Sequence, residues 1–171
     1  GRMLGSEDLY RARDAISQLY HEKGYITSGA ILPDQEVADG VVVLQVIEGR
    51  LSEIDVKGVR AFHERYFTSR LEQAARPPVN VFRLEETLQL LQQDTLIDRV
   101  SANLLPGDEQ GESRIEVVVD EALGARLDIA ASNHRPPSIG EYSGEFYGEV
   151  ANIYGIGDRV SLEYKIAEGL H

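Results

Sequence analysis

The sequence contains no cysteine, which excludes a disulfide framework and any thiolate-bound metal site. It also lacks a run of about 18 apolar residues, the length that a helix needs to cross a bilayer, and we expect no signal peptide at its start. Gly1-Arg2-Met3 does not resemble a natural start, and a helix is predicted almost at once. We therefore expect the chain to be an internal part of a longer protein.

Basic residues are scarce, since 17 lysines and arginines stand against 29 aspartates and glutamates, for a formal net charge of −12. This charge repels a nucleic-acid backbone and opposes adhesion to an anionic lipid surface. We therefore expect no nucleic-acid partner. With 42% hydrophobic and 27% charged residues, the composition is that of an ordered globular chain.

The first part of the chain alternates between helical and strand-like patterns. Apolar residues at helical spacing predict a helix that Ser6 caps and Gly24 ends. A short strand-like segment at 26–32 follows, and after a polar turn the β-branched run 41–47 predicts a mostly buried strand. The alternating residues of 50–57 predict one more strand.

A second set of elements follows in the same order. One helix is predicted to stop before Pro77 and another to begin at Asn80 as its cap, and strands are predicted around 100–104 and 115–119. We expect the second of these helices to pack on the strands and form a core from these residues: Leu84, Leu88, Leu91, Val100, Ala102, Ile115 and Val117.

The repetition is also visible in the residue types. Ile31-Leu32-Pro33 corresponds to Leu104-Leu105-Pro106, and Val46-Ile47-Glu48 corresponds to Val118-Val119-Asp120. The period is about 72 residues, which indicates a serial array of small modules. One unit has the order β-α-α-β-β, and the first copy lacks its opening strand and helix. We expect the two copies to superpose.

After Gly124 the helical periodicity disappears, and three long alternating segments follow, each with one apolar face. Gly155-Ile156-Gly157-Asp158 predicts a tight turn between the second and the third. Strands of about 10 residues with one apolar and one charged face are typical of a transmembrane β-barrel, although a soluble antiparallel meander with one face on a core fits the same pattern. In a barrel, the residues expected to face lipid are Tyr142, Phe146, Val150, Val160, Leu162 and Ile166. Those expected to line the lumen are Glu145, Glu149, Arg159, Glu163 and Lys165.

Several stretches carry a family resemblance. Residues Gly24-Tyr25-Ile26-Thr27-Ser28, Leu32-Pro33-Asp34-Gln35, Val46-Ile47-Glu48-Gly49-Arg50-Leu51 and Ile54-Asp55-Val56-Lys57-Gly58 resemble the POTRA (polypeptide-transport-associated) region of two-partner secretion transporters. Asn152-Ile153-Tyr154-Gly155-Ile156-Gly157-Asp158-Arg159 resembles the first inter-strand turn of that family's barrel. These transporters are the haemolysin and filamentous-haemagglutinin secretion/activation proteins, a branch of the Omp85 superfamily, and the resemblance covers nearly the whole chain.

The resemblance implies a fold of α+β POTRA modules followed by antiparallel strands of a transmembrane β-barrel. Residues 1–49 would be the C-terminal part of a first POTRA domain, 50–123 a second, and 124–171 the first strands of an incomplete barrel. It also implies a bacterial outer-membrane protein, with its POTRA domains in the periplasm, that exports one large, unfolded, β-rich partner exoprotein. We expect the chain alone to transport nothing. We expect its open-edged strands to associate with copies of themselves, to pair with the edge of another chain or to require detergent.

Catalytic motifs are not recognisable. The four histidines are scattered at His21, His63, His134 and His171, without an acid or nucleophile at the spacing of a known motif. Glu48 and Asp120 occupy equivalent places in separate repeats, which favours turn capping over acid–base chemistry. We therefore expect no enzyme activity, no cofactor and no metal ion.

Peptide binding has a stronger physical basis. In a β-α-α-β-β module the second strand, here about 98–104, is expected at a sheet edge, where unpaired backbone groups can accept an extended peptide. The groove between this strand and the helix 80–94 would contact a β-rich client through Arg83, Thr87, Arg99, Ser101 and Asn103. The alternative is that these polar side chains are simply solvated.

Other functions fit the same patterns. An Omp85-type factor that assembles other outer-membrane proteins shares both the module and the barrel. A soluble scaffold of POTRA-like modules would bury Phe146 and Leu162 in its own core, whereas a barrel turns them toward lipid. A closed pocket lined by Glu48 or Asp120 would indicate an enzyme.

Overall fold

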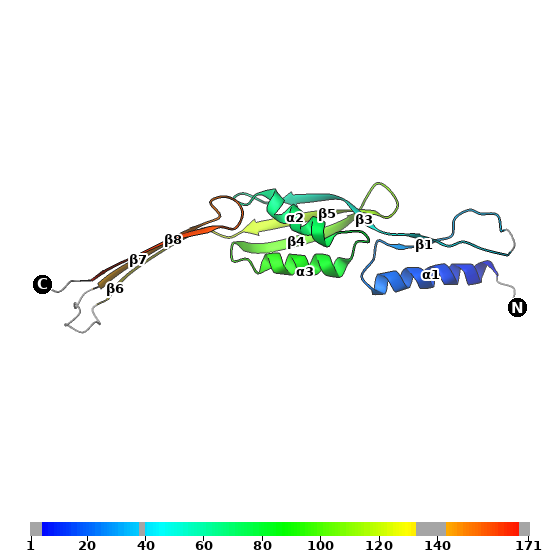
Figure 1. Ribbon diagram of the computed structural model, residues 1–171, viewed down its shortest axis with the longest axis horizontal. Helices are drawn as coiled ribbons and strands as arrows, with labels where there is room; N and C mark the ends of the chain where they lie inside the picture. The colour runs from blue at the N-terminus through cyan, green and yellow to red at the C-terminus, as the bar shows by residue number, and fades with distance from the viewer. Residues whose placement is uncertain (1–4, 38–39, 133–142, 168–171) are drawn as a thin grey trace.

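The computed structural model describes residues 5–37, 40–132 and 143–167. Its elements follow one another along the long axis of the molecule, from the N-terminal helix at one end to the last strands at the other (Figure 1). The described strands form three separate sheets, with the orders β1-β2, β3-β5-β4 and β6-β7-β8. No helix in the described part of the chain is long and apolar enough to span a membrane.

The first module is small and consists of α1 (Ser6–Glu22) packed on an antiparallel pair, β1 (Gly29–Ile31) and β2 (Gln45–Ile47). Both strands are shorter than predicted. The predicted buried strand over 41–47 is wrong in its first part, where Val43 is 57% exposed. The reason is a side chain: the amide of Gln35 donates to the Val43 carbonyl and accepts from the Val43 N–H, both at 2.8 Å, in place of a neighbouring strand.

The ends of α1 agree in part with the prediction. Gly5, and not Ser6, is the N-cap, because its carbonyl already accepts the first helical hydrogen bond from the Asp8 N–H at 3.0 Å. The Asp8 carboxylate accepts in turn from the Gly5 N–H at 3.1 Å. At the other end Gly24 has φ +87°, the left-handed conformation predicted for it.

The second module is an α+β sandwich of two helices on one sheet (Figure 1). Its elements are β3 (Arg50–Lys57), α2 (Glu64–Ala74), α3 (Val81–Gln92), β4 (Ile97–Pro106) and β5 (Glu112–Glu121). Strand β5 is central, parallel to β3 and antiparallel to β4. Helix α2 packs against β3 and helix α3 against β4.

The predicted core of the second module is confirmed. Leu84 and Leu91 of α3 are buried in one cluster with Ile115 and Val117, and Leu88 packs against it half-buried together with Val100 and Ala102. Phe67 and Leu71 complete the cluster from α2 and are fully buried. Asn80 caps α3 as predicted, since its side-chain oxygen accepts from the Phe82 N–H at 3.0 Å.

The two modules share one order of elements. The first has α1, β1, β2 and then β3, and the second has α3, β4, β5 and then β6. In both copies the two strands after the helix pair antiparallel, and Val46 and Val118 both lie in the second strand of that pair. The repeated order is therefore present in the fold, while the superposition of the copies stays a prediction.

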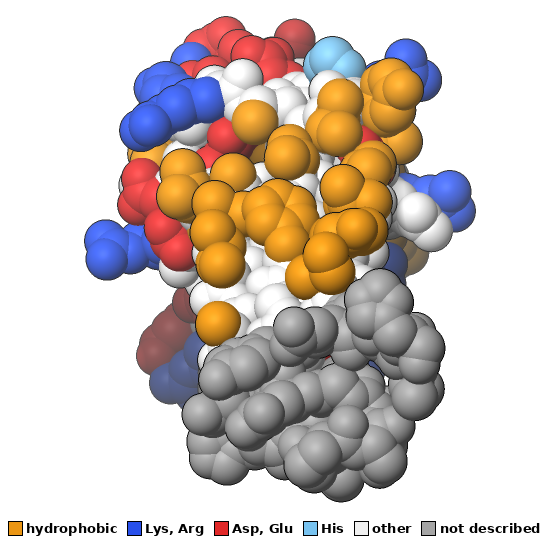
Figure 2. Space-filling model, turned by 90° about the vertical axis from the view of Figure 1, so that its left-hand side faces the viewer, with side chains coloured by type: hydrophobic (Ala, Val, Ile, Leu, Met, Phe, Trp, Pro, Cys, Tyr) orange, Lys and Arg blue, Asp and Glu red, His pale blue; other side chains and the backbone are white. Residues whose placement is uncertain are grey.

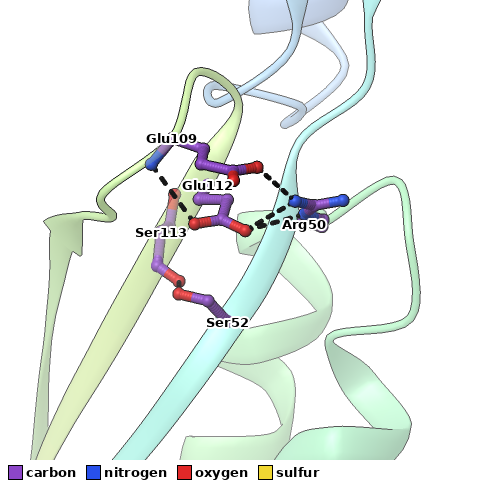
Figure 3. A network of polar contacts seen from close by, with 5 residues as sticks. All are labelled: Arg50, Ser52, Glu109, Glu112 and Ser113. Atoms are coloured by element: carbon purple, nitrogen blue, oxygen red, sulfur yellow. Dashed lines mark hydrogen bonds and ion pairs between the residues drawn. The ribbon is translucent and has the colours of Figure 1, made fainter.

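The second module begins at Arg50 with several hydrogen bonds of its own, and Gly49 just before it connects the first module to the second. The Arg50 N–H donates to the Gly111 carbonyl at 2.8 Å, and the Val79 N–H donates to the Gly49 carbonyl at 2.9 Å. The Arg50 guanidinium forms ion pairs with Glu112, the first residue of β5, at 2.7 Å and with Glu109, in the loop before β5, at 2.8 Å (Figure 3). The Glu112 hydrogen bond, with its charge, raises the pKa of Arg50.

The third sheet is an antiparallel meander of β6 (Ala125–Ser132), β7 (Ser143–Ala151) and β8 (Arg159–Ala167). It projects from the second module at the end opposite to α1 (Figure 1). Among the described residues of this sheet, only Ala151, at the end of β7, enters the hydrophobic core of the second module.

Candidate functional site

Strand β4 lies at an edge of its sheet, as predicted, and β3 lies at the other edge. Part of the β4 edge is already covered by Gln92 at the end of α3. The Gln92 side-chain oxygen accepts from the Val100 N–H at 2.8 Å, and its nitrogen donates to the Asp98 carbonyl at 2.9 Å. Gln92 thus occupies the place of one peptide unit of a further strand. No sequence pattern predicts this role, because it depends on where the helix ends relative to the strand.

These two bonds show which backbone groups of β4 point away from β5. Alternate residues of an antiparallel strand direct their N–H and C=O groups to the same side. The groups of Ala102 and Leu104 therefore also point outward, beyond the reach of Gln92. This short stretch is the open part of the edge.

The five candidate side chains lie on two different surfaces. Val100, Ala102 and Leu104 pack toward the helices, so Arg99, Ser101 and Asn103 are exposed on the opposite face of the sheet. Arg83 and Thr87 lie on the side of α3 that faces α2. The predicted single groove between α3 and β4 is therefore wrong, because the sheet alternation and the rotation of α3 turn these side chains apart. Their binding of a client stays a prediction.

Arg83 and Thr87 border a hollow of about 430 Å³ between α2 and α3. Across from them, the guanidinium of Arg70 lies 3.7 Å from the ring centroid of Tyr66. Burial and a 3.0 Å hydrogen bond from the Tyr66 hydroxyl to Asp94 raise the pKa of Tyr66. Tyr66 and Arg70 could not be predicted from the sequence, since helical periodicity does not say which face of α2 meets α3.

The apolar side chains of β6–β8 share one face of the third sheet. Cross-strand partners of an antiparallel sheet lie on the same face, and Ile129 pairs with Phe146, which pairs with Tyr164. We call this surface the apolar face, and it comprises Leu127, Ile129, Phe146, Val150, Val160, Leu162, Tyr164 and Ile166. Figure 2, seen from the end of the molecule where these strands lie, shows hydrophobic side chains gathered in one field with charged side chains at its sides.

The apolar face is open. Leu162 is 65% exposed and Ile129 is 74% exposed. The predicted grouping is confirmed for Phe146, Val150, Val160, Leu162 and Ile166, and the predicted Tyr142 lies outside the described residues. The alternating charged residues lie on the opposite face, namely Glu145, Glu149, Arg159, Glu163 and Lys165. The environment of either face stays a prediction.

A tight turn joins β7 to β8, as predicted. The Asp158 carboxylate accepts from the Tyr154 N–H at 3.0 Å, and the Gly157 N–H donates to the Asn152 side chain at 2.9 Å. The turn rests on the second module, where the His63 N–H donates to the Gly155 carbonyl at 2.9 Å. Gly155 has φ +72°, and a side chain there would collide with His63.

The two carboxylates considered for chemistry are exposed and lie on different modules, Glu48 after β2 and Asp120 in β5. The capping role predicted for them belongs to Glu121 instead. Its carboxylate accepts from the N–H groups of residues 60–62 at 2.8 to 3.1 Å. Burial alone would raise the pKa of Glu121, but these three bonds and the charge of Arg60 lower it.

No cluster of three metal-binding side chains occurs in the described ranges.

Comparison with known proteins assigns this architecture. The family described as POTRA domain, ShlB-type, matches residues 1–49. The outer membrane transporter CdiB of Dickeya dadantii is 26% identical over 159 residues, which are 90% of this chain and 27% of that protein. The chain is a homologue of outer-membrane transporters. The resemblance to two-partner secretion transporters is therefore confirmed.

Two further comparisons agree with this result. The heme/hemopexin transporter protein HuxB of Haemophilus influenzae is 26% identical over 168 residues, which are 95% of this chain and 29% of that protein. The solved structure of CdiB from Escherichia coli matches 95% of this chain and 30% of its own length, with a TM-score of 0.65 and 24% identity. The fold class, α+β POTRA modules followed by antiparallel strands, is confirmed. The chain thus spans less than a third of these relatives, which are transporters.

Proposed function

We propose that the chain is the part of an outer-membrane transporter that receives an unfolded partner exoprotein in the periplasm and passes it to a β-barrel pore. In this proposal residues 1–49 belong to a first POTRA domain, 50–123 form a second, and 124–171 supply the first barrel strands, which face outer-membrane lipid. The task is binding and translocation, without catalysis or a cofactor.

The exposed apolar face carries this proposal. A soluble scaffold would bury Phe146 and Leu162 in a core, but the third sheet leaves Leu162 65% exposed and Phe146 37% exposed. A soluble monomer rarely exposes such a continuous apolar surface to water, whereas the hydrocarbon layer of a membrane solvates it. The same sheet continues directly from the α+β module. An exposed apolar sheet attached to such a module favours membrane strands joined to a periplasmic binding module.

Within the module, we place client binding at the open part of the β4 edge. Natural proteins protect edges with charged side chains, and β3 carries Glu53, Asp55 and Lys57 on its exposed face. In contrast, β4 has no charged residue after Arg99. An extended client segment can therefore pair with Ala102 and Leu104 through its backbone, which demands little of the client's sequence.

The membrane part is tested with spin labels at Leu162 and Glu163, in the chain reconstituted into phospholipid nanodiscs. Oxygen, which concentrates in lipid, should relax the label at Leu162, and a water-soluble nickel reagent should relax the label at Glu163. Equal access of the nickel reagent to both positions would refute the assignment of β8 as a membrane strand.

The client part is tested with a photoreactive amino acid at Asn103 and, as the matched control, at Asp55 on the other edge. The probe is an extended peptide of about eight alternating Thr and Val residues, a length that fits one strand. We expect cross-linking at Asn103 only, and its loss when alternate peptide nitrogens are methylated, because these then donate no hydrogen bond. Cross-linking that is equal at both positions, or insensitive to methylation, would contradict the proposed edge.

A further inference from the structure

The turn between β7 and β8 connects two hollows of different character. One is almost wholly apolar and includes Val150, Val160 and Leu162 of the apolar face together with Ile153 of the turn. The other, of about 800 Å³, lies between the turn and α2 and includes Ile156. The apolar face therefore continues through the turn and ends against the second module.

The second hollow is bordered by two arginines of α2, Arg65 and Arg70. Both are exposed, and neither forms a salt bridge within the described ranges. Arg70 donates to the Tyr66 carbonyl at 2.5 Å and stacks on the Tyr66 ring, which fixes its guanidinium at the border of the hollow. Glu64 is the one carboxylate among the lining residues, next to the imidazole of His63.

Hydrogen bonding and packing hold the turn against this hollow. The Gly155 carbonyl is held by the His63 N–H at 2.9 Å, and Gly157 lies against the rings of Phe62 and Tyr66. Ile156 remains 62% exposed and Tyr154 71% exposed on this fixed turn. The turn thus presents an apolar tip at the same hollow that the two arginines border.

We propose that this hollow binds one phospholipid, with its phosphate on Arg65 and Arg70 and an acyl chain running along Ile156 and Ile153 onto the apolar face. The inference rests on the proposed function, in which that face lies in lipid. Guanidinium groups match the geometry of phosphate oxygens, and exposed Tyr154 suits the boundary between hydrocarbon and water. Because the net charge of −12 opposes an anionic surface, we expect the ligand to be zwitterionic phosphatidylethanolamine.

The test counts lipids retained by the chain in dodecyl maltoside by native mass spectrometry, during titration with palmitoyl-oleoyl phosphatidylethanolamine. The variant R65Q/R70Q should bind about 25-fold more weakly, at about fivefold for each arginine. The matched control R76Q/R114Q removes two other exposed arginines of the same module and should bind within about twofold of the unchanged chain. Equal weakening in both variants, or none in R65Q/R70Q, would overturn the phosphate assignment.

Two further ligands separate the headgroup from the chains. Palmitoyl-oleoyl glycerol, which has the same acyl chains without the phosphate, should bind the unchanged chain as weakly as phosphatidylethanolamine binds R65Q/R70Q. Inorganic phosphate at millimolar concentration should not displace the lipid, because phosphate lacks the acyl chain that contacts Ile156. For the same reason, the Ile156→Ser variant should lose affinity for the lipid. Displacement by phosphate, together with unchanged binding to Ile156→Ser, would mean a simple anion site and refute the proposal.

Failure of this inference is distinguishable from failure of the proposed function. The labels at Leu162 and Glu163 could show lipid on one face only while R65Q/R70Q binds phosphatidylethanolamine like the unchanged chain. That result would support the membrane strands and refute the phospholipid site. If both labels contact water equally, the membrane assignment falls whatever the arginine variants do.

Discussion

The side-chain amide of Asn80 donates a hydrogen bond to the carbonyl of Lys23 at 2.9 Å, so the cap of α3 is also a bond to the end of α1. The Asn80 oxygen accepts from the Phe82 N–H at the same time, and Asn80 is only 7% exposed. Next to it the Val81 N–H donates to the Gly24 carbonyl at 2.9 Å. One buried amide therefore sets both the start of a helix and the angle between two modules.

Two substitutions of Asn80 separate these roles. Asn80→Ala removes the cap and the bond to Lys23 and should cost about 2 kcal/mol, the sum of a typical cap and one hydrogen bond. Asn80→Ser keeps an acceptor for the cap but does not reach Lys23, and should cost about 1 kcal/mol. Urea unfolding measures both. Equal stability of Asn80→Ser and the unchanged chain would show that the contact with Lys23 contributes nothing.

Leu88→Ala tests the packing of α3 on the sheet. Leu88 is half-buried against the core of the second module, so its truncation should cost about 2 kcal/mol, at the low end for a core leucine. Leu90→Ala is the control, since Leu90 is 61% exposed on the same helix, and it should change the free energy of unfolding by less than about 0.5 kcal/mol. A loss below that value for Leu88→Ala would mean that the packed face of α3 is misassigned.

Glu121, at the end of β5, should make the stability of the second module dependent on pH. Because its folded-state pKa is lowered, its contribution to stability is complete above the ordinary pKa of 4.5 and is lost as the pH falls through the folded value. Glu121→Gln should therefore be less stable than the unchanged chain at neutral pH, and the difference should shrink in acid. Thermal unfolding between neutral and acidic pH measures this. Asp120→Asn, an exposed neighbour without such bonds, is the control, and a difference that grows in acid would refute the sign.

Leu162→Arg tests the apolar face in a barrel that contains these strands. A charge facing hydrocarbon near the midplane should destabilise the barrel by about 2–4 kcal/mol. Ser161→Arg places the same side chain on the opposite face of β8, next to the cross-strand Glu149, and should cost less than about 1 kcal/mol. Unfolding by urea in lipid bilayers measures both, and equal costs would contradict the assignment of the faces.

Most of the fold could be predicted because its signals are local. The alternation of Phe146, Gly148 and Val150 predicts the apolar face. The spacing of Leu84, Leu88 and Leu91 predicts the core of the second module. The predicted groove failed because it required the rotation of α3 about its own axis, which is fixed by contacts with α2 that are distant in sequence. The roles of Gln92 and Glu121 were missed for the same reason, since both act on backbone groups of other elements and no spacing rule marks such a partner.

The path of the chain from the module into the third sheet has a mechanical consequence. Strand β5 is hydrogen-bonded on both sides, to β3 and β4, and it leads through 122–124 directly into β6. The Ala122 N–H and the Gly124 carbonyl tie this short connection to Leu96 and Ala151. A pull on β6 along its axis loads β5 in shear, so both ladders of backbone bonds resist together and not one at a time. In the proposed transporter, force on a bound client would therefore strain the loops and the β4 edge before it extracted the central strand.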